Sequence, residues 1–253
     1  MSPFLKTAIE AAKAAQVVID KYYNGEFDVE IKPDLSPVTI ADTQTERAMR
    51  DGLENAFPGD AIFGEEFGQS GAGSDMWIID PIDGTRSFIT GLPLWGMLLG
   101  YVTGDGAQLG VIRMPALGEV YAGAKGIGAS CNGHSITVST CTSLSTARLF
   151  INEADKLAVH ERDVFARLAV AGELRRMGSD CYPHALVAVG LADAVVDYDL
   201  QPYDYLPVSA VIEASGGIMT DWSGAPLSMA SDGRTITAAT PELHGELVRL
   251  LNG

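Results

Sequence analysis

A run of apolar residues in this chain leads directly into two aspartates. Residues 76–84 read MWIIDPIDG, so the stretch from Trp77 to Ile79 is followed by Asp80, a proline, an isoleucine and Asp83. A short uninterrupted apolar run predicts a strand buried on both faces, and such a strand ends in polar turn residues. Asp-Pro and Asp-Gly are also ordinary turn pairs. The spacing therefore predicts a buried strand and leaves open whether its aspartates form a turn or a binding site.

The first half of the chain predicts two helices followed by strands. Apolar residues recur at helical spacing over residues 4–23, and Asn24-Gly25 supplies a stop. A second helix is expected after a cap at Thr39 or Asp42, and Pro58-Gly59 ends it. Strands are expected at residues 61–66 and 76–80 and in four runs between residues 94 and 137. Gly, Asp and Asn turns between those four runs indicate an antiparallel sheet.

The second half alternates strands with helices. Strands are expected at residues 147–152, 173–178, 192–198 and 216–222, and helices at 164–172, 182–191, 203–215 and 241–253. This alternation is typical of an α/β layer. A boundary near residues 140–146 would divide one compact catalytic unit into an N-terminal α+β lobe, residues 1–140, and a C-terminal α/β lobe, residues 141–253.

Composition narrows the classes of function. The 253 residues carry a formal net charge of -16, so a nucleic-acid partner is not expected. A small phosphorylated substrate is compatible with this charge where metal cations neutralise the local field. Three cysteines without paired spacing, Cys131, Cys141 and Cys181, predict free thiols in a cytoplasmic protein. Charges interrupt the N-terminal segment, and no apolar run reaches the roughly 20 residues of a membrane span, so neither a signal peptide nor a membrane partner is expected.

Several carboxylates fall at the ends of expected elements. They are Glu65 and Glu66 after a strand, Asp80 and Asp83 after the next strand, and Asp204 at the start of a helix. Brought together, they would repel one another unless a cation lay among them, and hard ions such as Mg²⁺ prefer oxygen ligands. With 33 acidic residues in the chain, each one alone is equally a solvated charge or a helix cap. Spacing alone does not decide between these interpretations.

Four segments resemble the signature segments of one superfamily. In chain order they are KPDLSPVTIADTQTE, GEE, WIIDPIDGTRSFITGLPLWG and YDYLPVSAVIEASGGIMTDWSG. They are similar to those of the inositol monophosphatase superfamily of Mg²⁺-dependent phosphomonoesterases. The resemblance implies a layered α+β sandwich, in which helices alternate with two sheets, two or three Mg²⁺ ions per site and a homodimer. It also implies that the metal ligands are the main-chain carbonyl of Ile82 and the side chains of Glu65, Asp80, Asp83 and Asp204.

The same resemblance assigns catalytic and phosphate-binding roles. Glu65 and Thr85 would activate a water that attacks phosphorus, and Asp42 would hold the Thr85 hydroxyl. Helix capping is the alternative role for both Asp42 and Thr85. The amides of Gly84 and Thr85 would point at the phosphate if a helix begins there. Arg86 would support the phosphate or be an ordinary solvated arginine at a helix start.

One branch of the superfamily is the better match. GSDCYPHALVAVGLADAVVD and LQPYDYLPVSAVIEASGG are similar to the histidinol-phosphate phosphatases, which implies hydrolysis of L-histidinol phosphate in histidine biosynthesis. The substrate carries an imidazole and an ammonium, for which Asp180 and Asp197 are the candidate partners, and Ser179 adjoins them. Turn or surface roles remain open for all three. The alternatives are an inositol monophosphatase, another small phosphate monoester phosphatase, or a non-enzymatic regulatory binding protein.

Overall fold

The computed structural model describes residues 3–23, 25, 29–31, 37–104 and 106–253. The helices are α1 (Pro3–Ile19), α2 (Ile40–Ala56), α3 (Thr85–Ile89), α4 (Ala154–His160), α5 (Arg162–Leu168), α6 (Tyr182–Ala188), α7 (Pro202–Ala214) and α8 (Pro241–Asn252). The strands are β1 (Val29–Ile31), β2 (Pro37–Thr39), β3 (Ala61–Gly64), β4 (Gly68–Ser70), β5 (Met76–Asp83), β6 (Gly96–Thr103), β7 (Gly106–Met114), β8 (Glu119–Ala124), β9 (Gly128–Cys131), β10 (His134–Ile136), β11 (Arg148–Ile151), β12 (Leu174–Met177), β13 (Ala194–Asp197), β14 (Ile218–Asp221) and β15 (Thr235–Ala238). Short 3₁₀ turns occupy Pro115–Leu117 and Leu144–Thr146.

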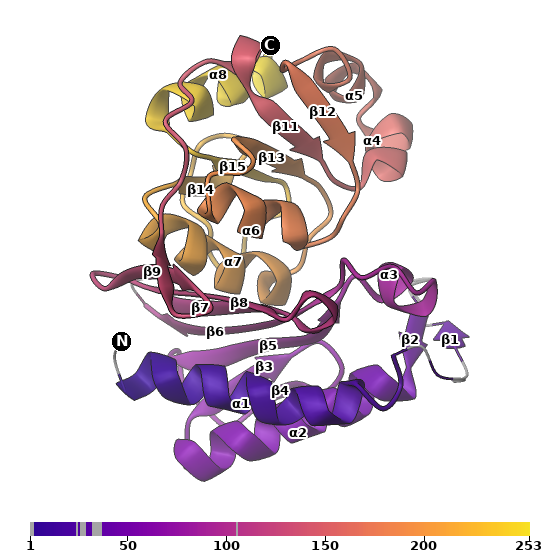
Figure 1. The fold of residues 1–253 in the computed structure, drawn as a ribbon, viewed down its shortest axis with the longest axis vertical. Coiled ribbons are helices and arrows are strands. Elements are labelled where there is room, and N and C mark those ends of the chain that lie inside the picture. Colours follow the sequence, from indigo (N-terminus) through magenta and orange to yellow (C-terminus); the bar gives the residue numbers. More distant parts are fainter. Residues whose placement is uncertain (1–2, 24, 26–28, 32–36, 105) are drawn as a thin grey trace.

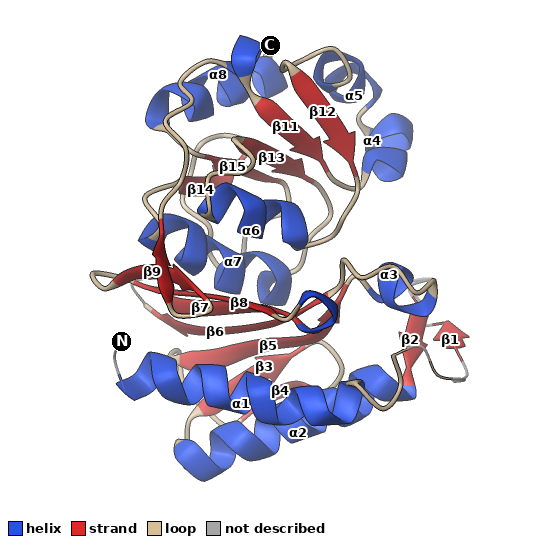
Figure 2. Ribbon diagram, in the orientation of Figure 1, coloured by secondary structure: helices blue, strands red, loops and turns tan. Residues whose placement is uncertain are grey.

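These elements stack in alternating layers of helices and sheets (Figures 1 and 2). Helices α1 and α2 cover the outer face of the first sheet, α6 and α7 lie between the two sheets, and α4, α5 and α8 cover the second sheet. This arrangement is the layered α/β fold that the sequence predicts. No helix in the described part of the chain is both long and apolar enough to cross a membrane.

The first sheet has the strand order β10-β9-β8-β7-β6-β5-β3-β4. Every neighbouring pair is antiparallel except β3 and β5, which are parallel. The antiparallel sheet predicted between residues 94 and 137 is therefore confirmed. Its strand β5 is buried along almost its whole length, because helices cover both of its faces.

A row of glycines lets helix α7 lie directly on this sheet. Gly100, Gly110 and Gly123 are opposite one another on β6, β7 and β8. A Cβ atom on Gly110 would lie 1.8 Å from the carbonyl oxygen of Pro207 in α7, so no larger residue fits there without moving the helix. This close packing fixes the first turn of α7, which carries Asp204, beside the end of β5.

The second sheet has the order β12-β11-β13-β15-β14. Strands β11, β12 and β13 are mutually parallel, whereas β15 runs antiparallel to β13 and β14. The carboxyl ends of the three parallel strands meet at one edge of the sheet, which is where ligands bind in open α/β sheets. Residues 152–153, 178–180 and 197–199 are thereby brought to the same edge.

Some elements differ from the sequence predictions. The helix predicted over residues 164–172 corresponds to α5, which begins and ends earlier, and the preceding short helix α4 is not predicted; leucines of both helices pack in the same core. Strands β1, β2, β4, β9 and β15 are not predicted, because runs of three or four residues carry little periodicity. The expected stop at Asn24 lies outside the described residues.

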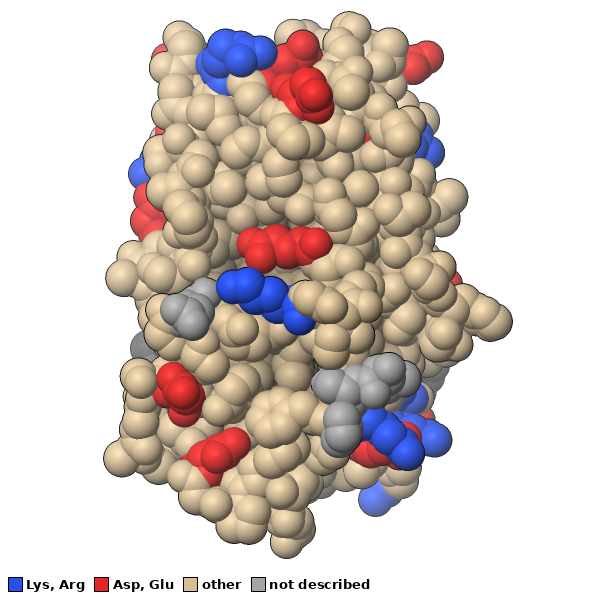
Figure 3. Space-filling model, turned by 90° about the vertical axis from the view of Figure 1, so that its left-hand side faces the viewer, with Lys and Arg blue, Asp and Glu red and all other residues tan. Residues whose placement is uncertain are grey.

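Surface charge agrees with the acidic composition. On the face drawn in Figure 3, Lys and Arg side chains are few, and they lie beside Asp or Glu side chains. A continuous basic surface, which nucleic-acid binding requires, is not seen on that face.

Candidate metal and phosphate site

The aspartates after the apolar run lie in a bulge of the strand and not in a turn. Strand β5 continues to Asp83, and its pairing with β6 shifts register between Asp80, opposite Leu98, and Asp83, opposite Gly96. Three residue steps on β5 thus face two on β6. In a regular strand, residues three apart point to opposite faces, and the extra residue of a bulge brings them to the same side. Pro81 suits this position because a bulge leaves an amide unpaired.

Three carboxylates converge beside this bulge. One oxygen from each of Asp80, Asp83 and Asp204 lies within 4.8 Å of the others. Asp80 Oδ1 accepts a hydrogen bond from the Ile82 amide at 2.8 Å, and Asp204 Oδ2 accepts one from the Gln201 amide at 2.7 Å. Asp83 Oδ2 accepts from the Cys181 amide at 2.6 Å. Backbone donors therefore orient all three side chains.

Burial makes this concentration of negative charge unfavourable. Asp80 is 1% exposed. Burial raises the pKa of Asp80, Asp83 and Asp204, and repulsion between neighbouring carboxylates raises it further. For Asp83 the pKa reaches about 8, with burial the largest cause and the charge of Asp180 the next. The cluster must bind protons or a cation to be stable at neutral pH.

An open cleft of about 360 Å³ joins the cluster to most of the predicted site residues. Its lining includes Glu65, Asp80, Ile82, Asp83, Gly84, Thr85, Arg86, Asp180 and Asp204. Glu65 follows β3, and its amide donates to the Ile79 carbonyl of β5 at 3.3 Å. Its charge raises the pKa of Asp80 and Asp204. Carboxylates and a main-chain carbonyl are the hard oxygen donors that suit Mg²⁺, so the residues present fit this ion.

Gly84 has a backbone conformation and surroundings that exclude a side chain. Its φ is +86°, in the left-handed region, and a Cβ atom would lie 2.6 Å from the carboxyl carbon of Asp180. Helix α3 begins at the next residue, Thr85, as predicted for a helix after the DGT sequence. The missing side chain at Gly84 lets the Asp180 carboxylate lie directly against the backbone at the start of this helix.

Thr85 and Asp42 are neighbours in the structure. The Thr85 hydroxyl lies 3.2 Å from the Ile82 carbonyl oxygen and 3.4 Å from Asp42 Oδ1, so its single proton serves one acceptor at a time. Asp42 Oδ2 accepts from the amide and the hydroxyl of Thr39, both at 2.7 Å, in the capping box of α2. Burial raises the pKa of Asp42 to about 6. Asp42 therefore caps a helix and also contacts Thr85.

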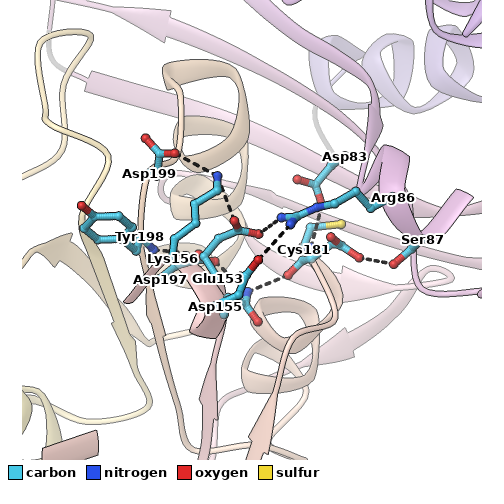
Figure 4. A network of polar contacts seen from close by, with 12 residues as sticks. Asp83, Arg86, Ser87, Glu153, Asp155, Lys156, Cys181, Asp197, Tyr198 and Asp199 are labelled. Atoms are coloured by element: carbon cyan, nitrogen blue, oxygen red, sulfur yellow. Dashed lines mark hydrogen bonds and ion pairs between the residues drawn. The ribbon is translucent and has the colours of Figure 1, made fainter. Parts of the chain in front are cut away.

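Ion pairs connect the two sides of the cleft at its rim (Figure 4). Arg86 of α3 contacts Glu153 and lies 3.5 Å from Asp155. Lys156 contacts Glu153 and Asp199, each at 2.8 Å. The Arg86 guanidinium is thus already paired with carboxylates of the second lobe. The sequence predicts a phosphate contact or a solvated arginine for this residue and does not indicate these ion pairs.

Asp180 and Asp197 lie deeper than the rim. Asp180 lines the cleft and accepts from the Ser87 hydroxyl at 2.5 Å. Asp197 is 3% exposed and accepts from Asn152 Nδ2 at 2.6 Å and from the Tyr198 amide at 2.8 Å, with His184 Nε2 at 3.1 Å. Both residues line a smaller inner cavity of about 50 Å³ that adjoins the cleft. Ser179 has a φ of +104° and lines neither space.

Asp197 is therefore not the surface residue that the sequence left as an alternative, and its contact with a substrate stays a prediction. Its carboxylate is held by three protein donors, so it meets a ligand only inside the inner cavity. Glu153 and Asn152, which also line that cavity, are functional candidates that sequence reasoning missed. Their only sequence signal is their place directly after the predicted strand at 147–152, since loops at the carboxyl ends of parallel strands carry sites.

Cys181 is buried beside the cluster and is not a nucleophile. Burial raises the pKa of its thiol, and the adjacent charge of Asp83 raises it further. The sulfur lies 3.8 Å from the sulfur of Met114. A thiol kept protonated in a packed position is unreactive.

Comparisons of sequence and structure show which known proteins this chain resembles. The sequence matches the model of the inositol monophosphatase family over residues 1–253. A histidinol-phosphatase from Chlorobaculum parvum is 40% identical over 230 residues, which cover 88% of each chain. The chloroplastic bifunctional phosphatase IMPL2 of Arabidopsis thaliana is 35% identical over 250 residues, covering 95% of this chain and 72% of the relative. A solved inositol monophosphatase from Zymomonas mobilis superposes with a TM-score of 0.90, at 32% identity and full coverage of both chains.

Proposed function

Because the chain belongs to the inositol monophosphatase family, we propose that it is a Mg²⁺-dependent phosphomonoesterase that hydrolyses L-histidinol phosphate to L-histidinol and phosphate. The observation that carries the substrate choice is the acidic lining beyond the metal cluster. Asp180 and Asp197 lie on the side where a leaving group would sit, and their carboxylates suit a cationic group better than a neutral polyol. The histidinol-phosphatase among the relatives supports the same choice.

The residues that would hold Mg²⁺ are the converging oxygens of the cluster. Asp80, Asp83, Asp204, Glu65 and the Ile82 carbonyl would share two or three ions, in a family that is Mg²⁺-dependent in general. Bound Mg²⁺ supplies charge neutralisation at the phosphate and makes a nearby water more acidic. The pKa values raised by burial mean that this binding displaces protons at neutral pH.

The remaining steps belong to the protein's own groups. The Gly84 and Thr85 amides lie at the start of α3, where backbone N–H groups face a phosphate. The Thr85 hydroxyl donates to Asp42 or to the Ile82 carbonyl, so its oxygen can accept a hydrogen bond from the attacking water and orient it. Glu65 on the cleft wall is the base that takes a proton from that water.

Inositol monophosphate is the second candidate substrate. The full-length superposition on the Zymomonas mobilis inositol monophosphatase favours it, because the layered fold and the cleft would be shared. A non-enzymatic regulatory role is disfavoured, since the carboxylate cluster is complete and costly to keep without a cation. A cytoplasmic homodimer is part of the proposal on the strength of the family resemblance, and light scattering of the purified protein tests the dimer.

A phosphate-release panel tests the function. L-histidinol phosphate, inositol 1-phosphate and glycerol 3-phosphate are compared at equal concentrations with Mg²⁺, and again with EDTA. We expect the highest kcat/KM for histidinol phosphate, no turnover in EDTA and recovery on adding Mg²⁺. Better turnover of inositol phosphate would reduce the proposal to a general phosphomonoesterase. Turnover that persists in EDTA would contradict the metal mechanism.

A further inference from the structure

Asn152 lies in the wall of the inner cavity, just past the end of β11, and is 2% exposed. Its Nδ2 group donates to Asp197 Oδ2 at 2.6 Å and to the Asp180 carbonyl oxygen at 2.8 Å. Both partners are acceptors, and a flipped amide would set oxygen against oxygen at both contacts. The hydrogen-bond network therefore fixes which end of the amide faces them.

The other end of this amide has nothing to bind. Asn152 Oδ1 is buried and has no hydrogen-bond partner among the described residues. The large majority of buried side-chain polar atoms in folded proteins are paired with protein or with ordered water, so an orphan acceptor in a cavity wall marks a place for a donor from outside the chain, either a water or a ligand group. Hydrogen bonds to Asp197 and Asp180 therefore orient the Asn152 side chain before any such donor binds.

The surroundings of Asn152 Oδ1 define the donor. The cavity wall contains the carboxylates of Asp83, Glu153, Asp180, Asp197 and Asp204. The one imidazole in the wall, that of His184, is held between Thr237 Oγ1 at 2.9 Å and Asp197 Oδ2 at 3.1 Å, so both of its nitrogens are engaged. The other lining residues are apolar or, like Tyr205, donate their hydroxyl elsewhere. Glu153 is already paired with Arg86 and Lys156, and Asp83 and Asp204 belong to the proposed metal cluster, so Asp180 and Asp197 supply the acceptors and the negative charge that suit a cationic N–H donor.

The volumes of the inner cavity and the cleft indicate which substrate group fits in each. A cavity of about 50 Å³ holds only a few water-sized groups, since one water needs about 10 to 15 Å³ by the same measure. An ammonium group is about as large as a water and fits, whereas a ring with its substituents belongs in the cleft of about 360 Å³. The two spaces share Asp83, Glu153, Asp180 and Asp204 as walls, so one small substrate can reach both.

We propose that the inner cavity is a subsite for a primary ammonium group on the leaving group, and that Asn152 Oδ1 accepts one of its N–H hydrogens. Asn152 is then a specificity-determining residue for phosphate monoesters of amino alcohols. This inference rests on the proposed function and deepens it, because the amine of histidinol phosphate is only two carbons from the ester oxygen. The imidazole ring of the substrate would then lie in the wider cleft.

The test compares two esters that differ only in the amine. L-histidinol phosphate and 3-(imidazol-4-yl)propyl phosphate are assayed with the wild-type protein and with Asn152→Ala. We expect the wild type to prefer the amine-bearing ester, and Asn152→Ala to lower that preference by about ten- to a hundred-fold, mainly through KM. Both esters share the phosphate and the ring, so losses of folding or of metal binding affect them alike.

Thr237→Val is the matched control. Thr237 supports His184 from the side away from Asp197 and is fully buried, so its loss disturbs the same network without removing the cavity acceptor. We expect its ester preference to stay at the wild-type value. Should Asn152→Ala fail to fold, Asn152→Ser, a smaller change in polarity, replaces it, and circular dichroism verifies the fold of each variant.

The outcomes separate this inference from the proposed function. Equal losses on both esters in the Asn152 variants, or an equal change of preference in Thr237→Val, would overturn the role of Asn152 while histidinol phosphate stays the best substrate of the panel. A wild-type protein indifferent to the amine would overturn the ammonium subsite with the panel result intact. Preference for inositol phosphate in the panel would overturn both.

Discussion

Replacing Asp83 with asparagine should stabilise the metal-free protein while it removes activity. The amide keeps the shape of the side chain, and its oxygen can still accept the 2.6 Å hydrogen bond from the Cys181 amide. What the substitution removes is a buried negative charge among Asp80, Asp180 and Asp204. Stability and function are therefore opposed at this position.

The magnitude follows from the pKa of Asp83, which burial raises from 3.8 to about 8. Below pH 4 the carboxyl group is protonated in both the folded and the unfolded chain and costs nothing. As the pH rises from 4 to 8 the unfolded chain releases its proton and the folded chain does not, so the folded state loses stability. About four pKa units at about 1.4 kcal/mol each give a ceiling of about 6 kcal/mol. Neighbouring carboxylates share the protons, so we expect a gain of about 2 kcal/mol for the variant at pH 8.

Urea unfolding in EDTA at pH 8 and at pH 4 measures this effect. Asp83→Asn should unfold at higher urea than wild type at pH 8, and the difference should shrink toward pH 4. Adding Mg²⁺ should reverse the order at pH 8, because only the wild type gains stability by binding the ion. Asp51→Asn, on an exposed position of α2, should match wild type throughout. A metal-free Asp83→Asn protein less stable than wild type at pH 8 would refute the reasoning.

Two further substitutions separate the roles of other residues. Thr85→Ala removes a hydroxyl that orients water and no metal ligand, so turnover should fall by about ten- to a hundred-fold while calorimetry shows unchanged Mg²⁺ affinity; a loss of affinity like that of Asp83→Asn would contradict this division. Asp180→Asn should raise KM for histidinol phosphate by about ten-fold or more relative to glycerol phosphate, and equal effects on the two esters in steady-state assays would show that Asp180 does not contact the leaving group.

The phosphate side of the site could be predicted because its residues are close in the sequence. Asp80, Ile82, Asp83, Gly84 and Thr85 belong to one segment, and the buried strand before them already restricts where they lie. The local geometry was still misjudged, because a turn and a bulge both place a proline between polar residues. The pairing with β6 shows the bulge, and pairing partners are not visible in a single segment.

The position of Asp204 depends on contacts between distant segments. Helix α7 reaches the cluster because Gly100, Gly110 and Gly123 lie in register on three strands. Each glycine alone is typical of a turn or a weak strand position, and their common row appears only when the strands pair. Without the family resemblance, the sequence would have left Asp204 as one acidic residue among many.

Asn152 and Glu153 could not be predicted for a different reason. Their importance depends on which atoms are already paired: Asn152 Nδ2 is engaged with Asp197 and its Oδ1 is not. Residue type and spacing contain no record of hydrogen-bond orientation. The left-handed backbone of Glu153, with φ of +46°, is also a tertiary feature, because a glutamate has no intrinsic preference for it.

The two sides of the site are built by different parts of the fold, and this bears on how substrates are chosen. In the proposed function, the bulge of β5 and the first turn of α7 would position the phosphate, whereas residues after the parallel strands β11, β12 and β13 would contact the leaving group. Substitutions after β11, such as those at Asn152, can alter the inner cavity without replacing a group that contacts the carboxylates of the proposed metal cluster. We infer that a change at Asn152 is one short route by which this fold exchanges an amino alcohol phosphate for a neutral one.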